Sequence, residues 1–234
     1  MPSLKNWDNR TWLSSKKYIE SFNSFILKQQ KLNKDSKILD IGCGRGKIIE
    51  NLSNKLKLIN KPVGLDIENH KDKSKKIIFK KTDAITFVNK TKNTFDLILI
   101  KQTIHLLQIA QITKFLKVCK NKLNPGGKII ILSLDPNNNE IPAFSLMDKK
   151  LKNSLKRDIK IFNLIVKTFN NIIVKRFKFN VKILRKEYVK MIKKRYISTL
   201  LNFNDKQILG GINEINLNYK KELKFKDRLI CLIL

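Results

Sequence analysis

The sequence contains few cysteines, few glycines and few acidic residues. Among 234 residues it has 3 cysteines, 8 glycines and 19 aspartates and glutamates. Cys43, Cys119 and Cys231 are an odd number and form no Cys-x-x-Cys pair, which argues against a zinc site or a disulfide framework. We therefore expect no metal and three reduced, mostly buried thiols.

Long apolar runs are also missing. No segment approaches the roughly eighteen apolar residues of a membrane span, and residues 1–10 lack the apolar block of a signal peptide. We expect a soluble, cytoplasmic protein with no membrane partner. The length and the 42% hydrophobic content suffice for one core. The prediction is a single domain, 1–234, with an N-terminal helical cap (1–35), a ligand-binding core (36–135), and a helical lid with closing strands (136–234).

The shortage of acidic residues leaves a formal net charge of +31. A dense cationic surface favours nucleic acid, because binding releases counterions from phosphates. Lysine is about six times as frequent as arginine and only three alanines occur, a departure from average usage that an AT-rich genome produces. Such a genome does not explain the scarcity of glutamate. The charge is spread along the chain, so we favour a solvated lysine coat, with nucleic acid as the alternative partner.

Short apolar runs alternate with helix-like stretches in the first part of the chain. The predicted strands are 37–41, 61–67, 77–84, 95–100 and 127–135. This alternation predicts an α/β fold with a mostly parallel sheet covered by helices on both faces. The first 35 residues are predicted to be helical, and "NPGG" (124–127) indicates a turn. The later predictions are amphipathic stretches at 144–170 and 186–201, a strand at 172–184 and a final apolar run at 228–234.

Three of the eight glycines, Gly42, Gly44 and Gly46, stand in "ILDIGCGRG" (38–46). Glycines where a strand turns into a helix allow the backbone to bend and to approach a ligand, which predicts a nucleotide-type site. The spacing differs from the Gly-x-Gly-x-x-Gly of dinucleotide sites. Asp40 would also repel a pyrophosphate, whereas it suits a cationic ligand.

Acidic residues also follow the predicted strands. Asp40, Asp66 and Asp83 stand at the carboxyl ends of the first three strands. Because these ends meet at one edge of a parallel sheet, the three carboxylates are expected to form an acidic pocket in a basic protein.

The ordered segments "ILDIGCGRG", "GLDIE", "TDA", "FDLILIKQTIHLL" and "LNPGGKIIILSLD" closely resemble the class I S-adenosylmethionine-dependent methyltransferases over residues 36–135. The resemblance implies a Rossmann-like, seven-stranded, mostly parallel sheet with helices on both faces and an antiparallel last strand, which "ELKFKDRLICLIL" fits. It also implies S-adenosyl-L-methionine as the cofactor and methyl transfer as the activity.

The resemblance implies a set of cofactor-binding residues: Asp40, Gly42, Cys43, Gly44, Gly46, Asp66, Ile67, Asp83, Ala84 and Lys101. Asp66 would accept both ribose hydroxyls, because a carboxylate offers two acceptor oxygens. Asp83 would accept from the adenine amino group, Ala84 would offer its backbone N–H to the ring, and Asp40 would support the amino end of the methionine part.

The residues facing the methyl acceptor are less clearly marked. His105 follows the fourth predicted strand and is the candidate general base, with a packing role as the alternative, whereas His70 is predicted to be solvated. Trp12, Tyr18 and Tyr196 are candidates for the acceptor pocket, and Lys101 and Arg195 for contacts to an anionic acceptor.

We expect a small-molecule acceptor, methylated on O, N or S. An RNA methyltransferase using the basic surface is the alternative. An NAD-dependent oxidoreductase, in which Asp66 would hold the ribose, is the remote one.

Overall fold

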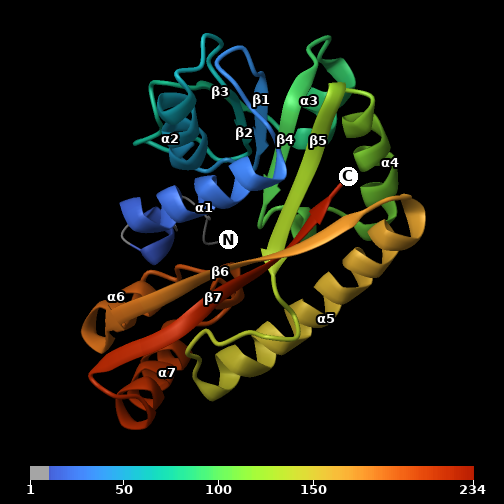
Figure 1. The fold of residues 1–234 in the computed structure, drawn as a ribbon. Coiled ribbons are helices and arrows are strands. Elements are labelled where there is room, and N and C mark those ends of the chain that lie inside the picture. Colours follow the sequence, from blue (N-terminus) through green and yellow to red (C-terminus); the bar gives the residue numbers. More distant parts are fainter. Residues whose placement is uncertain (1–10) are drawn as a thin grey trace.

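The computed structural model describes residues 11–234 and contains a seven-stranded sheet in the order β3-β2-β1-β4-β5-β7-β6 (Figure 1). The strands are β1 (Ile38–Ile41), β2 (Val63–Asp66), β3 (Ile78–Lys81), β4 (Phe95–Lys101), β5 (Leu123–Leu134), β6 (Ile173–Leu184) and β7 (Glu222–Ile233). The α-helices are α1 (Lys16–Gln29), α2 (Lys47–Leu56), α3 (Ala84–Lys90), α4 (Ile109–Lys120), α5 (Ser145–Thr168), α6 (Arg185–Lys193) and α7 (Asp205–Asn218). Short 3₁₀ helices are η1 (Trp12–Ser14), η2 (Ile104–Leu106) and η3 (Ser198–Leu200).

The sheet has the predicted topology. Strands β1 to β5 pair in parallel, and β7 pairs antiparallel with both β5 and β6. The prediction of a mostly parallel Rossmann-like sheet with a reversed last strand is confirmed.

Alternate side chains of β4 pack against helices on opposite faces of the sheet. Leu97 and Leu99 belong to a core cluster with residues of α1 and α2, whereas Ile98 and Ile100 belong to a second cluster with residues of α3, α4 and α5. A strand buried on both faces is apolar at nearly every position, as this one is.

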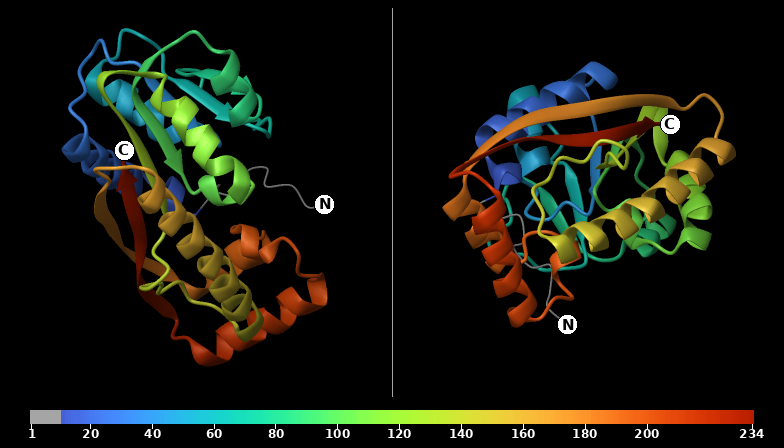
Figure 2. Two further views of the ribbon diagram at one scale, coloured as in Figure 1. Left: turned by 90° about the vertical axis from the view of Figure 1, so that its right-hand side faces the viewer. Right: turned by 90° about the horizontal axis from the view of Figure 1, so that it is seen from below.

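Strands β6 and β7 form a long ribbon that extends past the rest of the sheet. They pair with each other along their full length, but β7 pairs with β5 only over its last residues, where Leu229 lies opposite Leu134. Because β7 runs against β5, its first half projects beyond the carboxyl ends of the parallel strands. The segment that joins the two ribbon strands, with α6, η3 and α7, therefore stands at that end of the sheet (Figures 1 and 2).

Helix α1 attaches the N-terminal region to this ribbon. Tyr18, Phe22 and Ile26 are four residues apart and fully buried, so they form one face of the helix. The rings of Tyr18 and Phe22 pack edge-on against Phe177 of β6, at 5.6 and 5.3 Å between ring centroids. Helix α1 lies within the region predicted as a helical cap, of which residues 1–10 lie outside the described part of the chain.

Three local predictions need correction. The helix predicted over 186–201 ends at Lys193, and Arg195 then takes a left-handed φ of 51°. Helix α7 was not predicted, although Asn204 and Gln207 form a capping box at its start. The "NPGG" segment lies within β5 as an irregularity, because the pairing with β4 shifts between Phe95 and Leu97.

Within residues 11–234 there is no helix of the length and apolarity that crossing a membrane requires.

Candidate functional site

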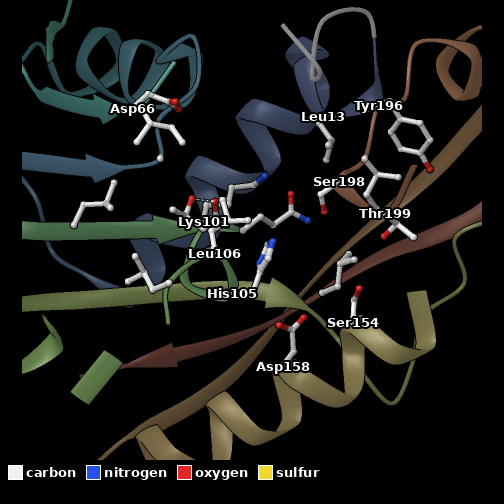
Figure 3. Close-up of a pocket in the computed structure, with 18 of the residues that line it drawn as sticks. Leu13, Asp66, Lys101, His105, Leu106, Ser154, Asp158, Tyr196, Ser198 and Thr199 are labelled. Atoms are coloured by element: carbon white, nitrogen blue, oxygen red, sulfur yellow. Dashed lines mark hydrogen bonds between the residues drawn. The ribbon is translucent and has the colours of Figure 1, made fainter. Parts of the chain in front are cut away.

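A cavity of about 630 Å³ lies at the carboxyl ends of the parallel strands, below the projecting part of the ribbon (Figure 3). One part, the sheet half, includes Gly42, Leu65, Asp66, Ile67, Asp83 and Ala84. The other part, the lid half, includes Leu151, Leu155, Asp158, Tyr196, Ile197 and Asp227. Lys101, His105 and Leu106 line the cavity between the two halves.

Gly42 is the glycine of the loop that lines the cavity, and its position requires glycine. Its φ is +75°, and a Cβ built there would lie 2.0 Å from Oγ1 of Thr103. At Gly44 a Cβ would meet nothing within 4 Å, but φ is +54°. Gly46 is the N-cap of α2, and its Cβ would collide with Ile77. The loop therefore turns tightly against β2 and leaves backbone on the cavity side.

The loop N–H groups donate inside the protein. Those of Gly42 and Cys43 both reach the carbonyl oxygen of Leu65 at 2.9 Å, and that of Gly46 reaches the carbonyl of Cys43. The N–H of Gly44 donates to Oδ2 of Asp66 at 2.8 Å. These four groups are not available to a pyrophosphate, which argues against a dinucleotide site.

Asp66 lies at the end of β2 with both carboxylate oxygens held in place. Besides the bond from Gly44, its Oδ1 accepts from the N–H of Glu68 at 2.9 Å, and Nε2 of His70 lies 3.7 Å from Oδ2. Burial raises the pKa of Asp66, but His70 and the two N–H groups outweigh that effect, so its pKa lies below the ordinary value. Asp66 is thus an ionised acceptor on the cavity wall, with lone pairs left for a vicinal diol.

His70 is buried, at 2% exposure, and not solvated as its lysine-rich loop suggested. The segment from Glu68 folds back so that the imidazole lies behind Asp66, where it supports the charged carboxylate. One signal in the sequence is the four-residue separation between Asp66 and His70, a spacing that lets a loop bring the two side chains together.

Asp83 and Ala84 open α3 beside the cavity. Oδ1 of Asp83 caps the helix by accepting from the N–H of Thr86 at 2.8 Å. The side-chain and backbone hydrogen bonds to Thr86 hold the pKa of Asp83 below its ordinary value. Asp83, Ala84 and the exposed Ile67, three of the predicted cofactor-binding residues, all line the sheet half.

Asp40 and Cys43 lie behind the wall and not in it. Asp40 is 3% exposed, and burial raises its pKa to about 7, with Lys101 opposing and Asp66 adding to that rise. The Sγ of Cys43 lies against Gly64 of β2, and burial raises the pKa of its thiol. A contact between Asp40 and the cofactor would therefore pass through a neighbouring group or a water molecule.

Lys101 ends β4 in the floor of the cavity. Its ammonium lies 5.5 Å from the ring centre of Tyr18 and 5.6 Å from that of Phe22, and it lowers the pKa values of Asp40 and Asp227 by attraction. Aromatic rings and buried acidic groups of the protein thus surround the ammonium of Lys101, which weakens the expectation that it binds an anionic acceptor.

His105 lies in η2, and its ring points into the cavity (Figure 3). Burial and, next, the nearby Arg157 lower its pKa to about 4, so the imidazole is neutral at neutral pH. It can accept or donate a hydrogen bond there, but it is a weaker base than an ordinary histidine.

The four predicted acceptor residues separate into two groups. Trp12 and Tyr196 line the lid half and pack edge-on at 5.4 Å between centroids. Tyr18 is fully buried beneath the cavity. Arg195 points away from it, donating to the carbonyl of Phe203 and to Oδ1 of Asp205 at 2.7 Å. Neither Tyr18 nor Arg195 lines the cavity, which corrects both predictions.

Two cavity residues escaped the sequence analysis. Asp158 stands in α5 and Asp227 in β7, both outside the segments that carry the family resemblance. The heptad-like pattern of α5 offered one signal, because Asp158 interrupts its buried face between Leu155 and Ile161.

The residues of the sheet half fit an S-adenosylmethionine molecule. A backbone cradle at Gly42, two acceptor oxygens at Asp66, and the side chain and N-terminal N–H groups at the start of α3 face one continuous cavity. Within residues 11–234 no group of three His, Cys, Asp or Glu side chains is placed to hold a metal ion.

Residues 38–127 match a family model described as a methyltransferase domain. No curated protein matches the chain. Among solved structures, a protein described as a methyltransferase from an antibiotic biosynthesis pathway of Anabaena variabilis aligns over 90% of this chain and 95% of its own, with a TM-score of 0.60 and 16% identity.

Two other structures have similar scores. The plantazolicin methyltransferase BamL, in complex with a triazolic desmethylPZN analog and SAH, aligns over 97% of this chain and 87% of its own, with a TM-score of 0.54 and 16% identity. A SAM-dependent methyltransferase from Archaeoglobus fulgidus aligns over 92% and 94%, with a TM-score of 0.51 and 19% identity. At these identities the likeness shows a shared fold.

Proposed function

We propose that the chain, whose residues 38–127 match a methyltransferase domain, is a class I S-adenosylmethionine-dependent methyltransferase that methylates a small molecule bound in the lid half of the cavity. The observation that carries the proposal is that other elements cover the cavity at the carboxyl end of the sheet. Residues of β7, η3 and α5 cover the carboxyl end of the sheet and line a cavity of about 630 Å³ there. That volume is typical of small-molecule sites, and a covered site excludes polymers.

The names of similar structures support the same class of acceptor. One similar enzyme was crystallised with a desmethylPZN analog, and another is assigned to an antibiotic biosynthesis pathway. Both share the fold of this chain.

In this proposal the sheet half holds the cofactor, whose sulfonium-bound methyl group is already activated for displacement. Asp66 accepts the ribose hydroxyls, with its carboxylate oriented by Gly44 and Glu68. Asp83 and Ala84 bound the adenine, and Gly42 allows close backbone approach. Most of the rate acceleration expected from the protein then comes from alignment of the acceptor and exclusion of water.

His105 stands between the two halves, where it can orient the acceptor. Its pKa near 4 favours a hydrogen bond from a neutral imidazole over strong general-base catalysis at neutral pH. Trp12 and Tyr196 would shape the far wall of the acceptor site.

The test is transfer of labelled methyl groups from S-adenosylmethionine into a cell extract, fractionated by size before and after nuclease treatment. We expect the label in the low-molecular-weight fraction. Label in nuclease-sensitive, high-molecular-weight material would contradict the proposal and favour the basic surface as an RNA-binding face.

A further inference from the structure

The cavity has the opposite charge balance to the rest of the chain. Among residues 11–234 the acidic residues that line it are Asp66, Glu68, Asp83, Asp158 and Asp227, and the basic ones are Lys101, Lys150 and Arg157. Of the residues in 11–234, the cavity thus has 5 of the 18 acidic ones but 3 of the 48 lysines and arginines. Acidic side chains are therefore enriched in the site relative to the lysine-rich remainder of the protein.

Most of these carboxylates have partners inside the protein. Asp66 is held by two N–H groups and His70, and Asp83 caps α3. Asp227 accepts from Trp12 and is attracted to Lys101. These three carboxylates therefore stabilise the structure of the site through contacts within the protein.

Asp158 differs from them. It is 6% exposed, and within the described residues its carboxyl has no hydrogen bond or ion pair. The neighbouring Arg157 attracts it only through space, because that guanidinium donates to the carbonyl of Leu107 at 2.8 Å. Burial raises the pKa of Asp158 to about 6, which still leaves it mostly ionised at neutral pH.

The Asp158 carboxyl points from α5 into the cavity, on the side where His105 points in from η2 (Figure 3). The wall around it is largely apolar, with Leu151 and Leu155 on the same helix and Leu106 opposite. The polar residues Ser154 and Arg157 of α5 also line the cavity, but they donate to the carbonyl oxygens of Lys150 and Leu107. A buried carboxylate without a partner is unfavourable in such surroundings unless a ligand supplies a cation.

We infer that Asp158 binds the ammonium group of the acceptor, so that the substrate class is a small amine with an apolar body. The inference rests on the proposed function and assigns a substrate class to its acceptor site. An ammonium has N–H donors for the carboxylate, and the leucines beside Asp158 cover the apolar part of the molecule. It replaces the expectation of an anionic acceptor, since Arg195 lies outside the cavity and the ammonium of Lys101 is attracted to the buried Asp40 and Asp227.

The test compares three probes of one shape, benzylamine, benzyl alcohol and benzoate, binding to the protein saturated with S-adenosylhomocysteine and followed by NMR titration. We expect benzylamine to bind about tenfold or more tightly than the other two, as one charge-assisted hydrogen bond gives. Asp158→Asn should abolish the preference. Asp148→Asn, which removes an exposed carboxylate of the same helix that pairs with Lys152, should keep it.

The inference would be overturned if benzoate bound most tightly, if the three probes bound with equal affinity, or if no probe bound measurably. It would also be overturned if the preference for benzylamine persisted in Asp158→Asn. Calorimetry of S-adenosylhomocysteine with the same proteins separates this failure from that of the proposed function. If the cofactor product binds and the amine preference is absent, only the inference fails. If the cofactor product does not bind, the proposed function fails first.

Discussion

The indole Nε1 of Trp12 donates a hydrogen bond to Oδ2 of Asp227 at 3.0 Å, joining residues 215 positions apart in the chain. Both residues line the cavity, and Asp227 is only 1% exposed. Burial raises the pKa of Asp227, while the bond from Trp12 and the charge of Lys101 lower it. The contact fixes the segment before α1 against the last strand, at the far wall of the acceptor site.

Replacement of Trp12 by phenylalanine should lower the free energy of unfolding by about 1–3 kcal/mol, because a buried carboxylate loses a hydrogen-bond donor. Urea unfolding measures the change. Adding Asp227→Asn to the variant should recover part of the loss, since the amide is neutral. If Trp12→Phe were as stable as the wild type, the hydrogen bond would contribute nothing and the wall would be held by ring packing alone.

Replacement of Asp66 by alanine should weaken the binding of S-adenosylhomocysteine about tenfold or more, because two charge-assisted hydrogen bonds to the ribose are lost. Isothermal titration calorimetry gives the dissociation constant. The control is Asp148→Asn, which removes a carboxylate far from the sheet half and should leave the constant unchanged. An unaltered constant in Asp66→Ala would show that the ribose lies elsewhere.

The sheet could be predicted because its signals are local. Short apolar runs, the glycine loop and the carboxylates after the strands all lie between residues 36 and 135, and the structure places Asp66, Asp83 and Gly42 together as expected. Parallel strands bring their carboxyl ends to one edge, so order along the chain was enough to assemble the sheet half.

The lid half could not be predicted in the same way, because it depends on contacts between distant segments. The amphipathic pattern gave no sign that the helix ends at Lys193 and that Arg195 turns toward Asp205. Tyr18 is predicted to line the acceptor pocket, but its ring is fully buried and packs edge-on against Phe177 of β6. Asp158 lines the cavity because α5 packs against η2, a contact between distant segments that the sequence does not indicate.

Two replacements of His105 distinguish its possible roles. If the neutral imidazole orients the acceptor by a hydrogen bond, His105→Gln should keep turnover within about tenfold, and His105→Ala should lose about 10²-fold. Turnover should also show no titration of His105 between pH 6 and 8, because the pKa of this imidazole is lowered to about 4, so the pH profile of His105→Gln should match that of the wild type in this range. Equal and large losses in both variants, with stability unchanged, would instead indicate a general base.

The two adjacent glycines of α7 offer a matched pair. A Cβ at Gly211 would lie 2.5 Å from Cγ of Phe144, whereas one at Gly210 would meet nothing within 4 Å. Gly211→Ala should therefore destabilise the protein by about 1–3 kcal/mol through overpacking. Gly210→Ala should stabilise it by about 0.5–1 kcal/mol through helix propensity. Thermal unfolding of both should shift in opposite directions, and shifts of the same sign would contradict the packing of α7 against Phe144.

Because the pKa of Asp158 is raised in the folded state, the stability of the protein should depend on pH. The folded state holds the proton of this carboxyl up to a pH of about 6, whereas the unfolded chain loses it near its ordinary value of about 3.9. Because the folded state binds more protons in that interval, the contribution of Asp158 to stability falls as the pH rises from about 4 to about 6 and stays low above it.

Asp158→Asn has no such titration, so it should be more stable than the wild type at pH 7, by up to about 2–3 kcal/mol. The two proteins should become more similar in stability as the pH falls toward 4. The measurement is the difference between their free energies of unfolding at several pH values, which cancels the separate titrations of His105 and Asp40. A variant that is less stable than the wild type at pH 7 would mean that the carboxylate has a structural partner, and its charge would then not be reserved for a ligand.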